Sequence, residues 1–175
     1  LKLIEKTKNF NIFHFDEKWI FNSYIKSYKN IEPNKSELFE FIYLLTIKKK
    51  QDLFLTTGVT DNKLIIFLKS KFKKIDTNIY QYRIKNCSIF LIENLNIHNL
   101  EYLISKSGYV ITCHGAPSHL ANMYNKNLID IIDSSEQNLF SNWTHHFTNY
   151  KSLNREPFLK LSDKIIRIFG KYYVH

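Results

Sequence analysis

The chain has 175 residues, of which 44% are hydrophobic and 15% aromatic, so it is long and apolar enough for one domain with a substantial core. No apolar run approaches the roughly 20 residues that a membrane-spanning helix needs. The first residues lack the apolar stretch of a signal peptide and do not begin with methionine, so we expect a segment of a longer chain.

The formal net charge of +9 favours anionic partners: nucleotides, nucleic acid or anionic lipid head groups. The lysines are scattered along the chain, and no helix-turn-helix or RNA-binding signature accompanies them. We therefore expect no nucleic-acid partner. A peripheral position at an anionic membrane face is compatible with the charge.

The two cysteines, Cys87 and Cys113, lie beside or inside apolar runs. That placement is typical of buried thiols in a reducing compartment and not of a disulfide framework, so we expect a cytoplasmic protein. No group of Cys, His and carboxylate residues has the spacing of a metal site.

Apolar runs and helical periodicity alternate along the chain. The expected strands cover 9–15, 52–57, 88–92, 109–113 and 127–132. The expected helices cover 20–28, 34–50, 60–72, 96–104, 117–123 and 162–169, with Asn34, Thr60, Asn96 and Ser162 as their caps where a cap is visible. Segment 76–86 has no clear pattern, and 134–157 is expected to be a long irregular connection of the kind that forms lids or partner surfaces.

This alternation predicts an α/β fold: a Rossmann-like parallel sheet with right-handed crossovers and helices on both faces, forming a single domain over 1–175. Nearly continuous apolar strands such as 88–92 and 109–113 are typical of strands covered on both faces. Asp130 is unusual in such a strand, and we expect it near the strand's end or at a sheet edge. Trp19 is expected to pack in the core, and His145 and His146 to lie at the surface.

Ligands of such sheets bind at the carboxyl ends of the strands. Three loops there carry polar residues, at 16–19, 57–61 and 114–119. The last of them follows the strand at 109–113 and leads into a helix, the arrangement of a phosphate-binding corner with free backbone N–H groups and a positive helix dipole. Gly115 and Ala116 permit close approach of an anion, Pro117 suits the first helical turn, and His119 is placed to donate to a phosphate oxygen. The plainer interpretation is an ordinary turn with a solvated histidine.

The order of these pieces resembles the C-terminal half of family 9 glycosyltransferases, the ADP-heptose:lipopolysaccharide heptosyltransferase group. HFDEKW at 14–19 is similar to the family's Lys-Trp loop, LFLTTG at 53–58 to its strand ending in Thr-Gly, and HGAPSHLA at 114–121 to its signature, roughly D-(S/T)-G-P-x-H-(L/I)-A. His114 stands where the signature has Asp, and Ala116 where it has Gly. The resemblance covers roughly 10–132.

The resemblance implies one half of a GT-B enzyme, with the acceptor domain and the general base outside this segment. It implies transfer of a sugar from a nucleoside-diphosphate sugar to a cell-envelope glycan or glycolipid of the lipopolysaccharide type, with no metal and no turnover by this segment alone. The donor diphosphate would lie on Lys18 and the 114–119 loop: His114, Gly115, Ala116, Pro117, Ser118 and His119, through the N–H groups of 116–119. The nucleoside would contact Thr57, Gly58, Asp61, Glu93 and Asn94.

Plainer interpretations stay open for each of these residues. Lys18 is otherwise a solvated loop charge, 57–61 a plain turn, and Glu93 with Asn94 an ordinary strand end. For the whole chain, the two departures in the signature favour, as an alternative, a non-catalytic Rossmann-like binding domain with a decayed nucleotide site. A third interpretation is an unrelated doubly wound enzyme, or a nucleic-acid-binding domain that uses the basic surface.

Overall fold

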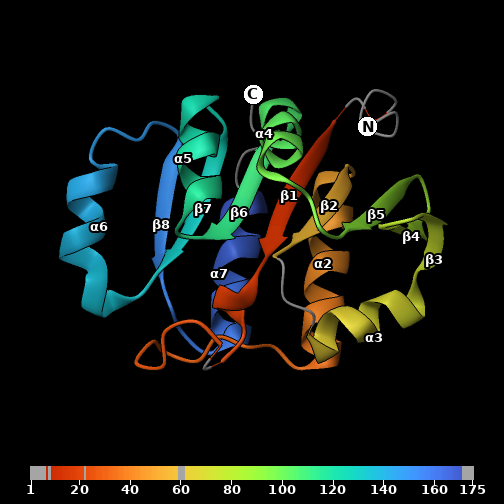
Figure 1. Ribbon diagram of the computed structural model, residues 1–175, viewed down its shortest axis with the longest axis horizontal. Helices are drawn as coiled ribbons and strands as arrows, with labels where there is room; N and C mark the ends of the chain where they lie inside the picture. The colour runs from red at the N-terminus through yellow and green to blue at the C-terminus, as the bar shows by residue number, and fades with distance from the viewer. Residues whose placement is uncertain (1–6, 8, 22, 59–61, 171–175) are drawn as a thin grey trace.

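A computed structural model describes residues 7, 9–21, 23–58 and 62–170, which form one eight-stranded sheet with helices on both faces (Figure 1). The strands are β1 (Phe10–Phe15), β2 (Asp52–Thr57), β3 (Lys73–Asp76), β4 (Ile79–Ile84), β5 (Cys87–Ile92), β6 (Tyr109–Cys113), β7 (Asn127–Ile132) and β8 (Tyr150–Asn154). The helices are α2 (Lys35–Lys49), α3 (Lys63–Lys71), α4 (Ile97–Lys106), α5 (Ala116–Met123), α6 (Gln137–Thr144) and α7 (Phe158–Gly170), with short 3-10 helices η1 (Glu17–Trp19) and η2 (Ser134–Glu136).

The strand order across the sheet is β3-β4-β5-β2-β1-β6-β7-β8, and all neighbours from β5 to β8 pair in parallel. Counting only these six parallel strands in chain order, the sheet reads 3-2-1-4-5-6, the Rossmann arrangement. The expected α/β fold is therefore confirmed. The chain builds the sheet outward from β1 in one direction, then returns and builds from β6 in the other, so β1 and β6 flank the topological switch point.

The core lies in two layers because successive strand residues face opposite sides of the sheet. On β1, Phe13 and Phe15 belong to the layer that α2, α3 and α7 cover, whereas Phe10 and Ile12 belong to the layer under α4 and α5. Figure 1 shows α4 and α5 in front of the sheet and α2 and α7 behind it. Trp19 is fully buried in the first layer, as expected.

Trp19 also ties the loop after β1 to the strand. Its ring packs edge-on against Phe13 with centroids 5.0 Å apart, and its indole N–H donates to the carbonyl of His14 at 2.9 Å. A buried indole needs such a partner for its N–H. The loop that begins at Asp16 is therefore anchored at the point where β1 ends.

Several expected elements differ from the structure. Among the described residues of 20–28 there is no helix, because side chains there bond to backbone groups and compete with helical hydrogen bonds: Ser23 Oγ contacts the carbonyls of Glu17 and Ile20. The unassigned segment 76–86 contributes to the β3–β4–β5 antiparallel edge of the sheet.

The later part of the chain is more regular than expected. Segment 134–157 contains η2, α6 and β8. These elements are short and consist mostly of polar residues, so the segment shows little hydrophobic periodicity. The last helix begins at Phe158, and Ser162 lies inside it with its Oγ contacting the Leu159 carbonyl. Thr60, expected to cap α3, lies outside the described residues, and Asn62 caps that helix. Within the described chain, no helix is both long and apolar enough to cross a membrane.

The N-terminus of α2 offers a test of the fold. Asn34 accepts from the Glu37 N–H at 3.0 Å, and the Glu37 carboxylate accepts from the Asn34 N–H at 2.8 Å, which forms a capping box. Asn34→Ala should lower the free energy of unfolding by about 1 kcal/mol in urea denaturation. Asn34→Asp keeps the acceptor and adds a favourable charge, so it should retain wild-type stability. Equal losses in both variants would contradict the assigned cap.

Candidate functional site

The loops after β1 and β6 meet at the switch point, and they bring Lys18 beside Gly115. A Cβ built on Gly115 would lie 2.9 Å from Lys18 Nζ, so only a residue without a side chain leaves the ammonium group where it is. The two residues are far apart in the sequence, and their loops become neighbours because β1 and β6 pair in the sheet. A cation thus stands at the start of α5, where the sequence predicts a phosphate-binding corner.

A cavity of about 260 Å³ opens at this point, just below the roughly 300–1,000 Å³ of common small-molecule pockets. Its walls combine basic, polar and aromatic side chains with backbone from the ends of β6 and β7. The lining residues are Lys18, Tyr24, Tyr28, Cys113, His114, Gly115, Ala116, His119, Ile131, Ile132, Asp133, Phe140, Trp143 and Arg155. A ligand of nucleotide size would be enclosed only in part.

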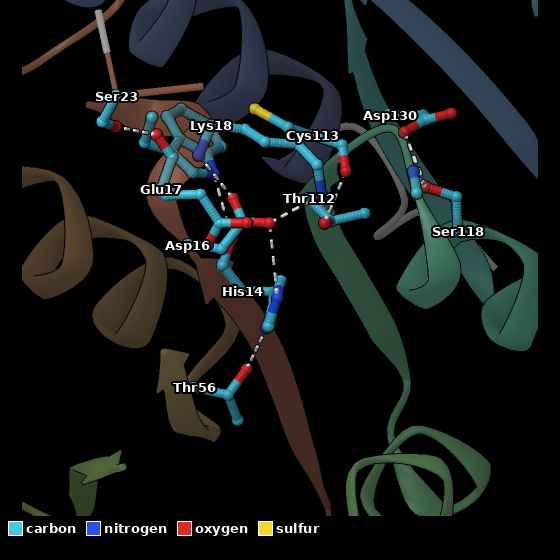
Figure 2. A network of polar contacts seen from close by, with 12 residues as sticks. His14, Asp16, Glu17, Lys18, Ser23, Thr56, Thr112, Cys113, Ser118 and Asp130 are labelled. Atoms are coloured by element: carbon cyan, nitrogen blue, oxygen red, sulfur yellow. Dashed lines mark hydrogen bonds and ion pairs between the residues drawn. The ribbon is translucent and has the colours of Figure 1, made fainter. Parts of the chain in front are cut away.

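Lys18 is fixed by a buried carboxylate. Asp16 is 4% exposed and accepts from Lys18 Nζ at 2.8 Å and from the Lys18 backbone N–H at 3.2 Å (Figure 2). Burial by itself lowers the pKa of Lys18, but the charge and hydrogen bond of Asp16 outweigh it and leave that pKa raised. Lys18 is therefore an ammonium ion at neutral pH, held in one place at the cavity wall.

His14 supports the same network from below, as Figure 2 shows. Its Nδ1 lies 2.9 Å from Thr56 Oγ1 on β2, and its Nε2 lies 3.6 Å from the Asp16 carboxylate. Burial lowers the pKa of His14; Asp16 opposes that shift and Lys18 adds to it. A neutral imidazole thus connects β1 to β2 underneath the Asp16–Lys18 pair.

A second carboxylate, Asp130, lies behind the 114–119 loop. The structure contradicts the expectation that Asp130 lies at a strand end or sheet edge: it is fully buried in the middle of β7, paired on both sides by β6 and β8. It is accommodated there because Ser118 Oγ donates to it at 2.8 Å and His114 Nδ1 lies 2.6 Å from it. Ser118 Oγ in turn accepts from the Gly115 N–H at 3.3 Å.

The start of α5 offers fewer free donors than the sequence predicts. Pro117 has no N–H, and the N–H groups of Ser118 and His119 donate to the Gly115 carbonyl at 2.9 and 3.3 Å. Of the expected row of N–H groups over 116–119, the Ala116 N–H is therefore the one that the first turn of α5 does not use. Pro117 and Ser118 are buried, whereas His119 is exposed and lines the cavity. Partial desolvation of its ring, followed by the repulsion that a proton on His114 would add, lowers the pKa of His119.

The structure places the predicted nucleoside residues elsewhere. Gly58 follows β2 and packs against Asp16 and Glu17, where an added Cβ would lie 3.2 Å from the Asp16 Cβ. Glu93 follows β5, which is separated from β6 by β2 and β1, and it forms an ion pair with Lys69 at 3.0 Å. Thr57, Gly58, Glu93 and Asn94 are not among the residues that line the cavity described above, and Asp61 lies outside the described residues.

Arg155 is a site residue that the sequence interpretation missed. It follows β8, is 7% exposed, and donates to the carbonyls of Lys18 and Lys29 at 2.6 and 3.0 Å. Its guanidinium also lies over the Tyr28 ring, 5.2 Å from the centroid. Within the described part of the chain no carboxylate forms an ion pair with Arg155, so its charge stays available to the cavity.

The aromatic side chains of the cavity were also missed. Tyr24 and Tyr28 come from the loop after η1, and Phe140 and Trp143 from α6. Tyr24 and Trp143 are more than half exposed, at 54% and 55%, although large aromatic side chains usually pack inward. Helix α6 is short and mixes polar with apolar residues, so hydrophobic periodicity does not reveal it. The aromatic content of the 134–157 segment is the one feature of the sequence that points to these cavity residues.

Comparison with known proteins supports the fold and leaves the family open. The chain resembles the solution NMR structure of ALG13 with a TM-score of 0.56 and 14% sequence identity, over 98% of this chain and 89% of that one. At this identity the likeness shows the fold, a Rossmann-like domain as in ALG13. No protein family and no curated protein matches the sequence, so the resemblance to family 9 is not confirmed.

The buried His14 predicts a dependence of stability on pH. Its pKa is lowered from 6.5 in the folded protein, so between that lowered value and 6.5 the unfolded chain binds a proton that the folded protein does not bind. The contribution to stability is complete above about pH 6.5 and is lost as the pH falls through the folded-state pKa. Urea denaturation between pH 7.5 and 5.5 should show a steeper loss of stability for the wild type than for His14→Asn. Equal slopes would contradict this assignment.

Proposed function

We propose that this domain holds the donor of a glycosyltransferase, with the diphosphate of a nucleoside-diphosphate sugar in the cavity between the ends of β1 and β6. The observation that carries the proposal is the position of Lys18 Nζ beside Gly115 at the topological switch point. Ligands of doubly wound sheets bind at this point. The fold is also similar to that of ALG13, and the resemblance of 114–121 to the family 9 signature favours sugar transfer.

The charges of the cavity favour a diphosphate. The cations Lys18 and Arg155 line it together with His119, whose lowered pKa leaves it a neutral hydrogen-bonding group, and the Ala116 N–H lies at the positive end of α5. Lys18 is fixed by Asp16 and Arg155 by two backbone carbonyls, so neither side chain loses much freedom when an anion binds. The negative charge of Asp133 works against an anion in the cavity. Its carboxylate accepts hydrogen bonds from the Lys29 N–H and from the N–H and hydroxyl of Ser135, so it is held by the segments that contain these two residues.

The aromatic walls favour a ligand with flat or ring-shaped groups beyond the phosphates. Tyr24 and Trp143 flank the cavity from two different segments and present exposed rings. Bases stack on aromatic side chains with about 1–3 kcal/mol each. Because the described members of the predicted nucleoside set, Thr57, Gly58, Glu93 and Asn94, do not line this cavity, we propose that the base or the sugar lies against Tyr24 or Trp143.

The reaction proposed is attack of an acceptor hydroxyl on the anomeric carbon of the donor sugar, with the nucleoside diphosphate leaving. Lys18 and Arg155 would stabilise the negative charge that develops on the diphosphate. The resemblance to family 9 suggests a cell-envelope glycan as the acceptor, with its binding residues and the base for its hydroxyl on a second domain. This chain by itself would then bind the donor without transferring the sugar.

Calorimetric titration with ADP, UDP and GDP tests the proposal. We expect saturable binding of at least one of them, weakened by added salt because part of the attraction is between exposed charges. Lys18→Ala removes a charged hydrogen-bond donor and leaves the Asp16 carboxylate unpaired, so the affinity should fall about tenfold to hundredfold.

Lys26→Ala is the matched control, because Lys26 lies in the same loop and is exposed. It should bind with the wild-type affinity. If both lysine variants lose affinity equally, the attraction is a general effect of net charge and not of this cavity. If the folded wild type binds none of the three nucleotides, the proposal fails and a non-catalytic domain with a decayed site becomes the better interpretation.

A further inference from the structure

Asp130 determines where the protons of its neighbours lie. Ser118 Oγ accepts from the Gly115 N–H and therefore turns its own hydrogen to Asp130. Tyr150 lies 3.4 Å from the same carboxylate, and burial followed by the Asp130 charge raises the pKa of Tyr150 to about 12, so it stays a neutral donor. An ionised carboxylate only accepts hydrogen bonds, and the Ser118 and Tyr150 hydroxyls that donate to Asp130 favour that ionised form. The contact of 2.6 Å with His114 therefore requires that His114 Nδ1 carries a proton.

The other ring nitrogen of His114, Nε2, has no hydrogen-bond partner among the residues that the structure describes. Nε2 is buried, and His114 is among the residues that line the cavity, so a ligand atom reaches Nε2 only if the rings beside it shift. The side chain is 6% exposed, with the rings of Phe140 and His119 packed against it at centroid distances of 4.4 and 5.3 Å. Since Nδ1 faces Asp130, Nε2 lies on the side of the ring away from β7.

A buried Nε2 without a hydrogen-bond partner costs more free energy when it carries a proton than when it carries only its lone pair. A second proton on His114 would place a buried N–H without an acceptor, and an unsatisfied charged donor is among the more expensive buried groups. The empty site therefore favours the neutral ring with its proton on Nδ1. A phosphate oxygen beside Nε2 reverses this preference, because it supplies the missing acceptor and a negative charge.

Titratable and charged side chains from several elements surround His114 at the cavity. They are Asp130 on β7, Tyr150 on β8, His119 on α5, Lys18 after β1, Asp133 after β7 and Arg155 after β8, while the described residues of α6 between 137 and 144 contain no ionisable side chain. The cations attract an anion into the cavity. Asp130 is the group that touches the ring and compensates a positive charge on it.

We propose that His114 takes up a proton when the donor diphosphate binds, and that Asp130 is the positioning residue that keeps Nδ1 protonated so that Nε2 is the nitrogen that gains it. The inference rests on the proposed function. His114 then donates through Nε2–H to a phosphate oxygen, as the middle of a chain that runs from the Asp130 carboxylate through the imidazolium to the diphosphate.

This arrangement has a consequence for sugar transfer. When the bond between the anomeric carbon and the diphosphate oxygen breaks, the bonding electron pair stays on that oxygen. The Nε2–H of His114 strengthens its hydrogen bond to the charge that develops, or passes its proton to the diphosphate and returns to the neutral ring. In the first case the proton stays on His114 until the nucleoside diphosphate dissociates and is then released to solvent, and in the second case it leaves on the nucleoside diphosphate.

The experiment is calorimetry with ADP-glucose, UDP-glucose and GDP-mannose in two non-phosphate buffers of different ionisation enthalpy at one pH. A nucleotide sugar is the right probe because its diphosphate is esterified at both ends and has no proton to exchange near neutral pH. The difference between the two observed enthalpies gives the protons taken up. We expect an uptake of up to about one proton per site, with the affinity falling by up to about tenfold for each unit of pH increase where the uptake is complete.

Three variants assign that proton. Asp130→Asn and His114→Gln should abolish the uptake and lower the affinity about tenfold or more, since a charge-assisted hydrogen bond is lost. His119→Gln is the control, because this second histidine lines the same cavity without touching Asp130; the uptake should persist. Nitrogen-15 NMR of the wild-type histidine rings, which needs no variant to fold, should show His114 protonated at Nδ1 when free and at both nitrogens when bound.

The outcomes separate the two proposals. Binding without proton uptake by the wild type would overturn the role of His114 and leave the donor site intact. Uptake lost only in His119→Gln would assign the proton to His119 and would overturn it as well. If the folded protein binds no nucleotide sugar, the proposed function fails and this inference fails with it.

Discussion

The pairing of β1 with β6 is the constraint on which the site depends. β1 is followed by the polar residues 16–18 and β6 by His114 and Gly115, and the parallel pairing forces both loops to the same edge of the sheet. Because the sheet grows away from this pair in both directions, no crossover helix covers the space between the two loops. The buried Asp16 then fixes Lys18 in that space, and Trp19 fixes the loop to the core.

Most of the fold could be predicted because its strands are strongly patterned. The central strands are continuous apolar runs, and the caps at Asn34 and Asn96 lie where the sequence predicts them. The elements that could not be predicted lack such a pattern. β3 is exposed throughout, and β8 is an edge strand of mostly polar residues, so neither presents the apolar run of a buried strand. Both depend on a neighbouring strand for their hydrogen bonds.

The candidate site was predictable only where its residues are close in sequence. The loop with Gly115 and His119 carries a recognisable motif, and Lys18 was expected from its order relative to that motif. Arg155 and Asp130 are different, because each reaches the site through strand order that no local pattern expresses. The one local signal for Asp130 was a carboxylate inside an apolar strand, which is costly unless hydrogen-bond donors surround it.

That carboxylate also bears on the departure from the family 9 signature at position 114. The signature has an acidic residue there, beside the start of the helix, whereas this chain has a histidine with the acidic residue directly behind it at Asp130. A carboxylate at 114 would stand in the cavity and repel a diphosphate from Lys18 and Arg155. With the acidic residue behind an imidazole, the charge stays in the protein but is buried on β7, and the residue at 114 is an imidazole. Under the proposed function, the histidine keeps a hydrogen-bonding group at the start of α5, and Ser118 and His114 supply the donors that the buried Asp130 needs.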